Sequence, residues 1–330
     1  MKNFCILPWY GNEIKLATGE ESICCWLTGP VDREELQREF LNDKRPTVCE
    51  RCWHNEDAGI ESRRMMENRF LDFKLNRDIS MIEDDARKSL SKINLYQFDL
   101  GSLCNGTCVT CGPTHSTAWK QLTGRNISIR NDSNLIDKNF EKIKNQINWK
   151  SAKRINLLGG ESLLIKKSFD ILELLLAYNN TECRISFVTN GSVNLSQKQI
   201  DLFKKFSDIN CCVSIDGIDK TFDYLRYPLK WEIVSKNLDT YRKFFKEVTV
   251  SYTISNLNYH ERDNTIKWFN DNNLLFIENF VSHPEYFNYR VMPGTTLWQR
   301  FVDEIKKQDS LKGISIKDYI PYIFEIMQKE

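Results

Sequence analysis

The sequence has no run of about eighteen apolar residues, the length that a membrane-spanning helix requires, so we expect no membrane span. It also lacks an excess of charge of either sign, since 46 basic residues face 45 acidic ones. This balance gives no electrostatic reason to expect a nucleic-acid or membrane partner. The start, MKNFCILPWYGNE, carries neither the apolar core nor the cleavage site of a secretory signal. We therefore expect a cytoplasmic protein.

Cysteine, by contrast, is abundant, with eleven residues. Because thiols stay reduced in the cytosol, this number indicates metal or cluster ligands rather than disulfides. Three cysteines lie within or beside apolar runs, where they are expected to behave as small hydrophobic side chains: Cys183, Cys211 and Cys212. The other eight form an N-terminal group and a triplet: Cys5, Cys24, Cys25, Cys49 and Cys52, then Cys104, Cys108 and Cys111.

Short β-rich runs alternate with amphipathic helical segments from Ile93 onward, the pattern of successive βα units around a parallel sheet. Several runs end in Gly or Asn-Gly, so the turns that leave them lie at the carboxyl edge of the sheet, where ligands bind. The predicted fold class is α/β, a partial, TIM-like (β/α)6 barrel preceded by a small cysteine-rich domain. The six predicted strands span residues 93–101, 154–160, 184–191, 210–217, 248–255 and 274–282.

The chain is expected to divide into three units. A charged stretch over residues 54–90 indicates exposed helix and linker, so the cysteine-rich unit and its linker take residues 1–90. The barrel takes residues 91–285. A helical extension takes residues 286–330, with two helices separated at Gly313 and no chemistry that the sequence identifies.

The triplet Cys104, Cys108 and Cys111 directly follows the first predicted strand of the barrel. Structural zinc usually takes four ligands in CxxC pairs and has a closed shell. Three thiolates in one loop would instead hold a four-iron cluster by three corners and leave one iron open to bind a substrate. Zinc, or a chance cluster of buried cysteines, is the alternative.

The spacing CxxxCxxC after a strand that begins a βα barrel resembles the radical S-adenosylmethionine (SAM) enzymes. This resemblance implies a [4Fe-4S] cluster on Cys104, Cys108 and Cys111, whose open iron binds the amino and carboxylate groups of S-adenosylmethionine. It implies that an electron, from a flavodoxin- or ferredoxin-type donor, splits the sulfonium and produces a 5′-deoxyadenosyl radical that abstracts hydrogen from a substrate.

Further residues carry the resemblance into the cofactor site. The stretch Gly159-Gly160-Glu161-Ser162 ends the second strand and looks like the GGE motif of the superfamily, whose backbone edge receives the ammonium of the cofactor. Glycines suit this role because no Cβ blocks close approach. The implied cofactor-binding residues are Gly159, Gly160, Glu161, Asn190, Ser214, Asp216 and Arg226.

Each of the implied cofactor-binding residues after Glu161 also has an explanation that involves no cofactor. Ser214 and Asp216 are two apart on one strand and share a face, but Asp216 before a glycine is also a turn residue. Asn190 precedes a glycine in an ordinary turn sequence, and Arg226 would equally suit an exposed helix end. One departure from the family is Thr110, where an aromatic residue is common before the third cysteine, and we expect Phe98 or strands five and six to supply that apolar contact.

In the N-terminal group, Cys5, Cys49 and Cys52 are expected to act as ligands together with either Cys24 or Cys25. Neighbours in a strand face opposite ways, so both members of the pair can hardly bind one centre, and Cys24 is preferred. A zinc ribbon is the alternative.

The motifs CxxPW, CC and CxxCW resemble the SPASM and twitch domains, which implies a second, auxiliary [4Fe-4S] cluster. Placement before the barrel is similar to a twitch-containing group often found in viral genomes, which would put the protein in a host cytoplasm.

Together these features predict an enzyme that oxidises, epimerises or crosslinks a peptide, or modifies a small polar metabolite, entering at the carboxyl rim between the two clusters. Two other classes remain open. One is a zinc-binding interaction module without catalysis, and the other is an iron-sulfur electron carrier that does not use S-adenosylmethionine.

Overall fold

The computed structural model describes residues 2–27, 31–75, 79–88, 93–124 and 132–328. One eight-stranded sheet dominates it, with the strand order β2-β1-β3-β4-β5-β6-β7-β8. All neighbours are parallel except the hairpin β1–β2. No helix in these ranges has both the length and the apolar character needed to cross a bilayer.

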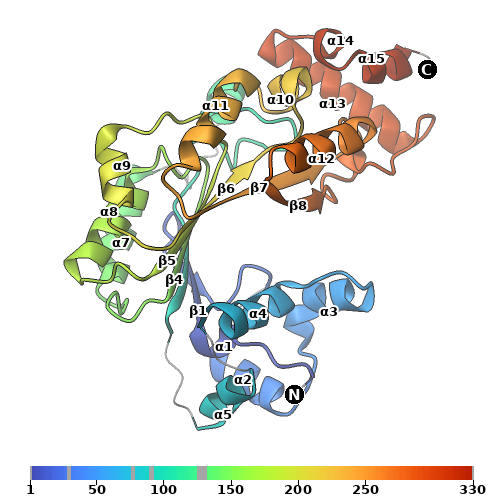
Figure 1. The fold of residues 1–330 in the computed structure, drawn as a ribbon. Helices are drawn as coiled ribbons and strands as arrows, with labels where there is room; N and C mark the ends of the chain where they lie inside the picture. Colours follow the sequence, from blue (N-terminus) through green and yellow to red (C-terminus); the bar gives the residue numbers. More distant parts are fainter. Residues whose placement is uncertain (1, 28–30, 76–78, 89–92, 125–131, 329–330) are drawn as a thin grey trace.

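The six strands predicted from the sequence are β3 to β8, which lie side by side and parallel in this sheet, so the α/β prediction of a partial barrel is confirmed. Helices separate them in the chain (Figure 1). The elements are β3 (Leu95–Asp99), α6 (Thr117–Thr123), α7 (Ser133–Lys144), β4 (Arg154–Leu158), α8 (Lys166–Ala177), β5 (Arg184–Thr189), α9 (Gln197–Phe203), β6 (Ile209–Ser214), α10 (Asp219–Leu225), α11 (Trp231–Tyr241), β7 (Glu247–Ile254), α12 (Arg262–Asp271) and β8 (Leu275–Phe280).

The two faces of the sheet differ in chemistry because side chains alternate along each strand. One face carries buried apolar side chains, such as Phe98, Leu157 and Val213, which pack against α7, α8, α9, α11 and α12. The other face, the lumen face, carries half-buried polar side chains, among them Asn156, Ser186, Ser214, Ser251 and Thr253. Burial of the apolar face fixes the sheet, and the lumen face is left to contact a ligand.

The N-terminal segment contributes to the same sheet. A hairpin turning at Gly19, with φ +74°, joins β1 and β2, and β1 then pairs with β3 in parallel. The unit also has its own apolar core around Phe4, Phe40 and Trp53. Its elements are α1 (Leu7–Tyr10), β1 (Gly11–Lys15), β2 (Glu20–Ser22), α2 (Arg33–Leu41), a 3-10 turn (Thr47–Cys49), α3 (Glu50–Asp57), α4 (Arg63–Leu75) and α5 (Ile79–Arg87).

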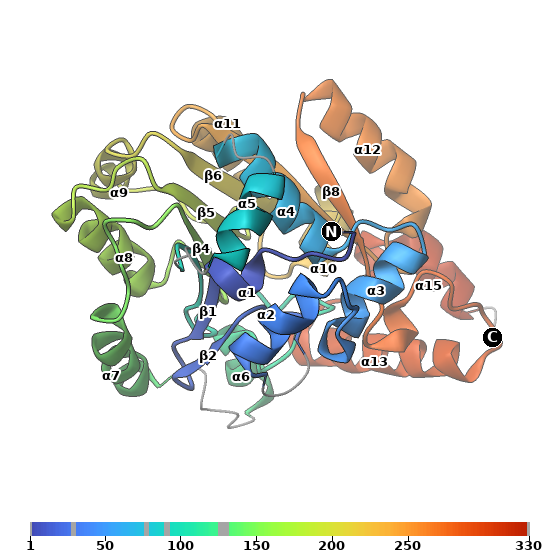
Figure 2. The ribbon, with the colours of Figure 1, turned by 90° about the horizontal axis from the view of Figure 1, so that it is seen from below.

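This unit lies on the lumen side of the sheet. Glu67 of α4 accepts a hydrogen bond from Arg154 on β4 at 2.6 Å, and Arg63 donates to Gln97 on β3 at 3.2 Å. Figure 2 shows the barrel helices following one another around the outside, with the N-terminal helices within that arc. The N-terminal cysteines are therefore held on the same side of the sheet as the lumen.

The C-terminal extension differs from its prediction in helix number. Gly313, in the left-handed conformation, ends α13 (Thr296–Lys312), and α14 (Ile316–Tyr319) and α15 (Pro321–Gln328) follow instead of one helix. Pro321 begins the third helix, because proline is tolerated at the first helical position but cannot continue a preceding one. The apolar core of the extension also contains Val109, which lies between two cysteines of the triplet.

Candidate metal centres

The triplet lies on a loop, residues 101–116, that leaves the carboxyl end of β3; we name it the triplet loop. Its backbone is fixed from two sides. Val109 donates its N–H to the carbonyl of Leu225 at 2.8 Å, and Thr107 donates to that of Tyr227 at 2.6 Å. On the other side, Trp119 donates its indole N–H to the carbonyl of Cys108 at 2.9 Å. The loop is thus held between α6 and the end of α10.

All three thiols of the triplet are partly exposed. Burial raises the pKa of Cys104, and it raises the pKa of Cys108 to about 12. The N–H of Gly106 donates to the Cys104 sulfur at 3.4 Å, a contact that favours the thiolate. Metal binding at this loop would release protons, because only thiolates act as ligands.

The arrangement of these thiols bears on the choice between one metal ion and a cluster. In the part of the chain that the structure describes, no three Cys, His, Asp or Glu side chains are arranged to hold a single metal ion. A four-iron cluster binds each thiolate through a different iron, so its ligands need not converge on one point. A Cβ added at Gly106 would lie 3.4 Å from the Cys108 sulfur, so the loop packs closely around its thiols.

The Gly-Gly-Glu segment is bonded directly to the triplet loop. Gly160 donates its N–H to the carbonyl of Gly101 at 2.9 Å, and Glu161 donates to that of Leu103 at 2.7 Å. A Cβ at Gly160 would lie 2.3 Å from the Leu103 carbonyl oxygen. Only glycine permits this approach, which joins the end of β4 to the loop of the cysteines.

The Glu161 side chain points into the protein. It is fully buried, and its carboxylate accepts hydrogen bonds from the Thr189 hydroxyl at 2.7 Å and the Asn190 N–H at 2.6 Å. Burial raises its pKa. Any contact of this segment with a cofactor would therefore use the backbone, while the carboxylate fixes the end of β5.

Asn190, at that end of β5, faces the triplet loop. Its side-chain amide donates to the side-chain oxygen of Asn105 at 2.8 Å and lies 4.0 Å from the Cys104 sulfur. The turn that follows is also formed, since Ser192 donates to the Asn190 side-chain oxygen. Asn190 therefore connects two of the loops that meet at the carboxyl edge.

Asp216 and Arg226 form a buried ion pair. Arg226 donates to the Asp216 carboxylate at 2.9 Å, and Thr253 donates its N–H to the same oxygen at 3.3 Å. Burial acts to lower the pKa of Arg226, but Asp216 and the nearby Cys108 raise it above its usual value. The exposed position considered for Arg226 is wrong, since the residue is only 9% exposed. Ser214 lies two residues before Asp216, half-buried on the lumen face.

Of the two sources expected for the apolar contact near the cofactor, Phe98 is wrong and strands five and six are left. Phe98 cannot line a cofactor site at the lumen, because it is buried on the helix-facing side and stacks on Trp149 with ring centroids 6.2 Å apart. Glu278 on β8 also faces the helices, where it pairs with Arg262 of α12 at 2.6 Å. Both residues lie on the face that packs against helices.

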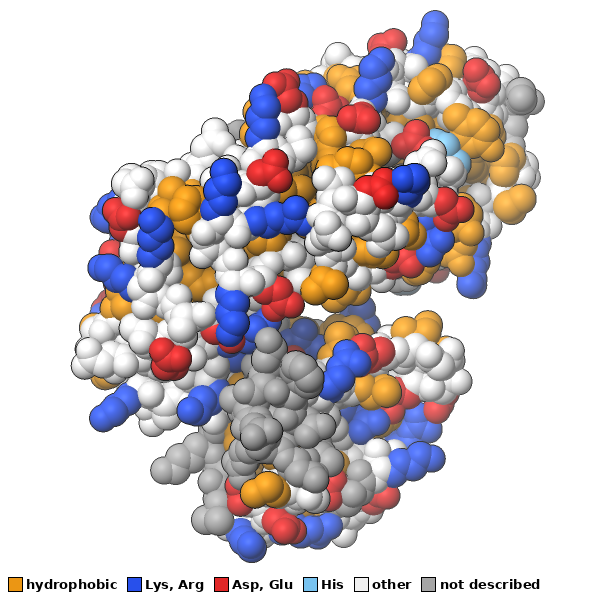
Figure 3. Space-filling view, in the orientation of Figure 1, with side chains coloured by type: hydrophobic (Ala, Val, Ile, Leu, Met, Phe, Trp, Pro, Cys, Tyr) orange, Lys and Arg blue, Asp and Glu red, His pale blue; other side chains and the backbone are white. Residues whose placement is uncertain are grey.

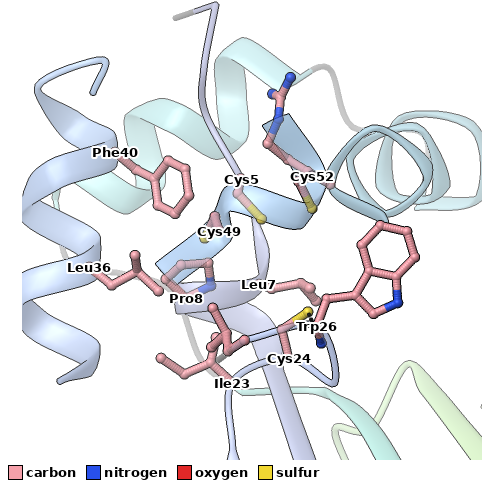
Figure 4. Close-up of a pocket in the computed structure, with 12 residues that line it drawn as sticks. Cys5, Leu7, Pro8, Ile23, Cys24, Trp26, Leu36, Phe40, Cys49 and Cys52 are labelled. Atoms are coloured by element: carbon pink, nitrogen blue, oxygen red, sulfur yellow. Dashed lines mark hydrogen bonds between the residues drawn. The ribbon is translucent and has the colours of Figure 1, made fainter. Parts of the chain in front are cut away.

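In the N-terminal unit, Cys5, Cys24, Cys49 and Cys52 border one cavity, and we name these four residues the thiol cage (Figure 4). They come from three segments: Cys5 precedes α1, Cys24 follows β2, and Cys49 and Cys52 lie at the end of the 3-10 turn and in the first turn of α3. Apolar side chains, including Leu7, Phe40 and Trp26, form most of the remaining wall. Burial raises the pKa of Cys5 and, to about 12, that of Cys49.

Cys25 turns away from this cavity. It borders a second one with Glu13, Arg63 and Gln97, on the lumen face of β1 and β3. The hydrogen bond between the two adjacent thiols raises the pKa of Cys24 and lowers that of Cys25. The side chains of Cys24 and Cys25 thus point in different directions, as expected for neighbours, and Cys24 points toward the other thiols of the cage.

The donor set of the thiol cage suits zinc as well as iron and sulfide, because both accept four thiolates. The free space bordered by the cage is about 390 Å3, including its open side.

Sequence reasoning missed the part of the extension that contacts the triplet loop. Gln308 of α13 donates its side-chain amide to the carbonyl of Val109 at 3.1 Å, and the Lys312 ammonium lies 4.7 Å from the centre of the Trp119 ring. One signal in the sequence could have identified these two residues. Gln308 and Lys312 lie on the same face of α13 as its buried apolar residues Phe301, Val302 and Ile305.

Comparison with known proteins identifies the family of this chain. The sequence pattern of the Radical SAM superfamily matches residues 100–269, just over half of the 330 residues. The chain belongs to the Radical SAM superfamily. The match begins at the end of β3 and includes the triplet, the Gly-Gly-Glu segment and the Asp216–Arg226 pair. No curated protein sequence matches the chain.

Solved structures of radical SAM proteins resemble this one at low identity. Native anSMEcpe with bound AdoMet is 16% identical, with 66% of this chain and 62% of that chain covered and a TM-score of 0.42. Streptococcus suis SuiB bound to the precursor peptide SuiA is 14% identical, with 90% and 69% covered and a TM-score of 0.44. This chain thus spans less than two thirds of the length of anSMEcpe.

Proposed function

We propose that the protein is an enzyme that cleaves S-adenosylmethionine reductively and uses the resulting radical to modify a substrate. The observation that carries this proposal is the hydrogen-bonded connection of the three-cysteine loop to the Gly-Gly-Glu segment, Asn190 and the neighbourhood of Arg226, all at one edge of the sheet. An electron carrier would need the thiols alone and would have no use for these elements.

The triplet would hold a [4Fe-4S] cluster through Cys104, Cys108 and Cys111. When bound, this cluster would supply the electron that splits the sulfonium of S-adenosylmethionine. The chain's own residues would bind and orient that cofactor: the backbone of Gly159, Gly160 and Glu161 toward its ammonium, and Arg226 toward its carboxylate.

The remaining cofactor residues have supporting contacts of their own. Ser214, half-buried on the lumen face, would bond to the ribose of the cofactor. Asp216 holds Arg226 in place, and Asn190 fixes the triplet loop beside Cys104. Glu161 contributes through its buried carboxylate, which orients the Asn190 backbone.

The N-terminal unit would hold a second, auxiliary [4Fe-4S] cluster through Cys5, Cys24, Cys49 and Cys52, as the resemblance to twitch and SPASM domains implies. The cage lies toward the amino ends of β1 and β3, whereas the triplet follows the carboxyl end of β3, so entry of a substrate between the two clusters at one rim is not supported. Zinc is a second candidate for this centre, because it also accepts four thiolates. Measuring iron and zinc in the same anaerobic sample decides between them.

The substrate would be a peptide or a small polar metabolite. SuiB, one of the similar structures, binds a precursor peptide. The lumen face of this chain is polar, and Figure 3 shows the surface hollowed between the N-terminal unit and the part that carries β8 and α12. Hydrogen abstraction there would lead to oxidation, epimerisation or crosslinking of the substrate, with electrons from a flavodoxin- or ferredoxin-type donor.

The test is anaerobic reconstitution with iron and sulfide, followed by dithionite and S-adenosylmethionine. We expect 5′-deoxyadenosine to form, and we expect none without dithionite. A protein that binds iron and sulfide but leaves the cofactor intact after reduction would be an electron carrier. A colourless protein with zinc and no iron would be an interaction module.

A further inference from the structure

The C-terminal helix α13 reaches the triplet loop through two buried polar side chains. Gln308, 3% exposed, donates to the carbonyl of Val109 at 3.1 Å. Lys312, 7% exposed, donates to the side-chain oxygen of Gln308 at 3.0 Å. Its ammonium also lies over the Trp119 ring, whose indole N–H donates to the carbonyl of Cys108. Lys312 is therefore connected to both Cys108 and Val109.

A buried ammonium is costly unless charge of the opposite sign lies nearby. The nearest carboxylates of the same helix bond to other groups: Asp309 accepts from the Tyr224 hydroxyl at 2.7 Å, and Glu304 accepts from Lys307 at 2.9 Å and from the Gln308 amide at 3.1 Å. Within the described ranges, no carboxylate lies within 4.0 Å of the Lys312 ammonium. The aromatic face of Trp119 and the Gln308 oxygen are its direct partners.

Two thiols of the triplet, Cys108 and Cys111, lie close enough to Lys312 to affect its pKa. Burial lowers the pKa of Lys312 to about 8, and Cys108, Asp309, Glu304 and Cys111 oppose that decrease. The cation thus predominates at neutral pH. Three thiolates on an iron-sulfur cluster would add negative charge at the place toward which this cation is held, and nearby charge and hydrogen bonds set the potentials of such clusters.

We propose that Lys312 is a positioning residue of the radical-generating centre, whose buried ammonium offsets the charge of a cluster on Cys104, Cys108 and Cys111 and raises its reduction potential. Gln308 and Trp119 hold the ammonium and the loop together, so the extension supports the cluster through packing, hydrogen bonds and charge. This inference rests on the proposed function of the triplet.

The experiment compares three variants after anaerobic reconstitution. Lys312→Met removes the charge, Lys312→Arg keeps it, and Lys307→Met removes an exposed charge from the same helix. Redox titration follows the cluster whose electron paramagnetic resonance signal changes when S-adenosylmethionine is added. The signal that remains in a Cys104→Ala/Cys108→Ala/Cys111→Ala protein identifies the auxiliary centre, if that centre holds iron.

For Lys312→Met we expect a more negative midpoint, with a ratio of reduced to oxidised cluster roughly five- to tenfold lower at the wild-type midpoint. This is the order that Coulomb's law gives for a unit charge roughly 12 to 17 Å from the cluster at an effective dielectric of about 20. A tenfold change corresponds to about 59 mV for one electron. Lys312→Arg should restore the wild-type midpoint, and Lys307→Met should leave it unchanged.

A structural role alone would lower iron content or thermal stability without moving the midpoint. If Lys312→Met does not retain its iron, Lys312→Gln serves in its place, because it keeps a polar partner for Gln308. An unchanged midpoint in the iron-replete variant, or an equal shift in Lys307→Met, would overturn the inference while leaving the proposed function intact. A wild-type protein without a signal that responds to S-adenosylmethionine would overturn both.

Discussion

The two cysteine sites of this protein hold their thiols in different ways. The triplet lies on one loop of eight residues from Cys104 to Cys111, with partly exposed sulfurs and backbone bonds to three other elements. The thiol cage collects its four sulfurs from separate segments and surrounds them with apolar side chains. A loop that offers three donors leaves a coordination position unfilled, whereas four donors in an apolar wall can close a shell.

Each site also has a buried or half-buried arginine held by a carboxylate. Arg226 pairs with Asp216 beside the triplet, and Arg64 pairs with Glu56 beside the cage, where it also donates to the carbonyl of Phe4 at 2.7 Å. The two arginines differ in what lies within their reach. Arg226 borders the open edge where a cofactor carboxylate would lie, while Arg64 ties together the segments that supply Cys5 and Cys52.

The largest expected effect comes from removing the triplet. A Cys104→Ala/Cys108→Ala/Cys111→Ala protein should lose all cleavage of S-adenosylmethionine and retain about four of about eight irons, because one of two four-iron clusters is lost. Iron analysis and 5′-deoxyadenosine formation are the measurements. Loss of half the iron with cleavage intact would mean that the chemistry belongs to the thiol cage.

A matched pair of single changes sharpens the description of the cage. Cys24→Ala should lose the metal of the N-terminal unit, whether iron or zinc, because it removes one of the four thiols that share the cavity. Cys25→Ala should keep that metal, because its thiol lies on the lumen face beside Arg63. Metal content of the two purified proteins checks this, and the reverse result would exchange the assignments.

Removing one arginine at a time compares the two ion pairs. Arg226→Met should destabilise the protein by about 3 kcal/mol, because it leaves Asp216 buried without its partner. Arg262→Met, which breaks the more exposed pair with Glu278, should cost about 1 kcal/mol or less. Urea unfolding of the metal-free proteins measures both. Equal losses of unfolding free energy in the two variants would show that the Asp216–Arg226 pair is not the more buried one in solution.

The smallest expected effect is on the pH dependence of folding stability. Burial acts to raise the pKa of the Glu56 carboxyl, but hydrogen bonds from Arg64 and Ser62 hold it below its usual value. A lowered pKa stabilises the folded state above pH 4.5, and the contribution is lost as the pH falls through the folded-state value. Glu56→Gln should therefore cost about 1 kcal/mol at pH 7 and nothing at strongly acidic pH. A pH-independent difference in urea unfolding would contradict this.

The order of strands and the positions of the triplet and the Gly-Gly-Glu segment were predictable from sequence, because buried strands, glycine turns and cysteine spacing are local signals. The partners of Asp216 were not, since Arg226 and Thr253 reach it through the fold. The face of the sheet on which Phe98 lies could not be predicted, because the apolar and polar residues of this short strand did not fix its register. Lys312 was missed because its contact with Trp119 spans nearly two hundred residues of sequence.

The central claim is that the triplet leaves one iron open for S-adenosylmethionine. The most direct measurement is low-temperature electron paramagnetic resonance of the dithionite-reduced, iron-replete protein with and without that compound. The account predicts that one cluster signal changes when S-adenosylmethionine is added and that this signal is absent when Cys104, Cys108 and Cys111 are replaced by alanine. Signals that are identical with and without the compound, in protein with full iron content, would contradict it.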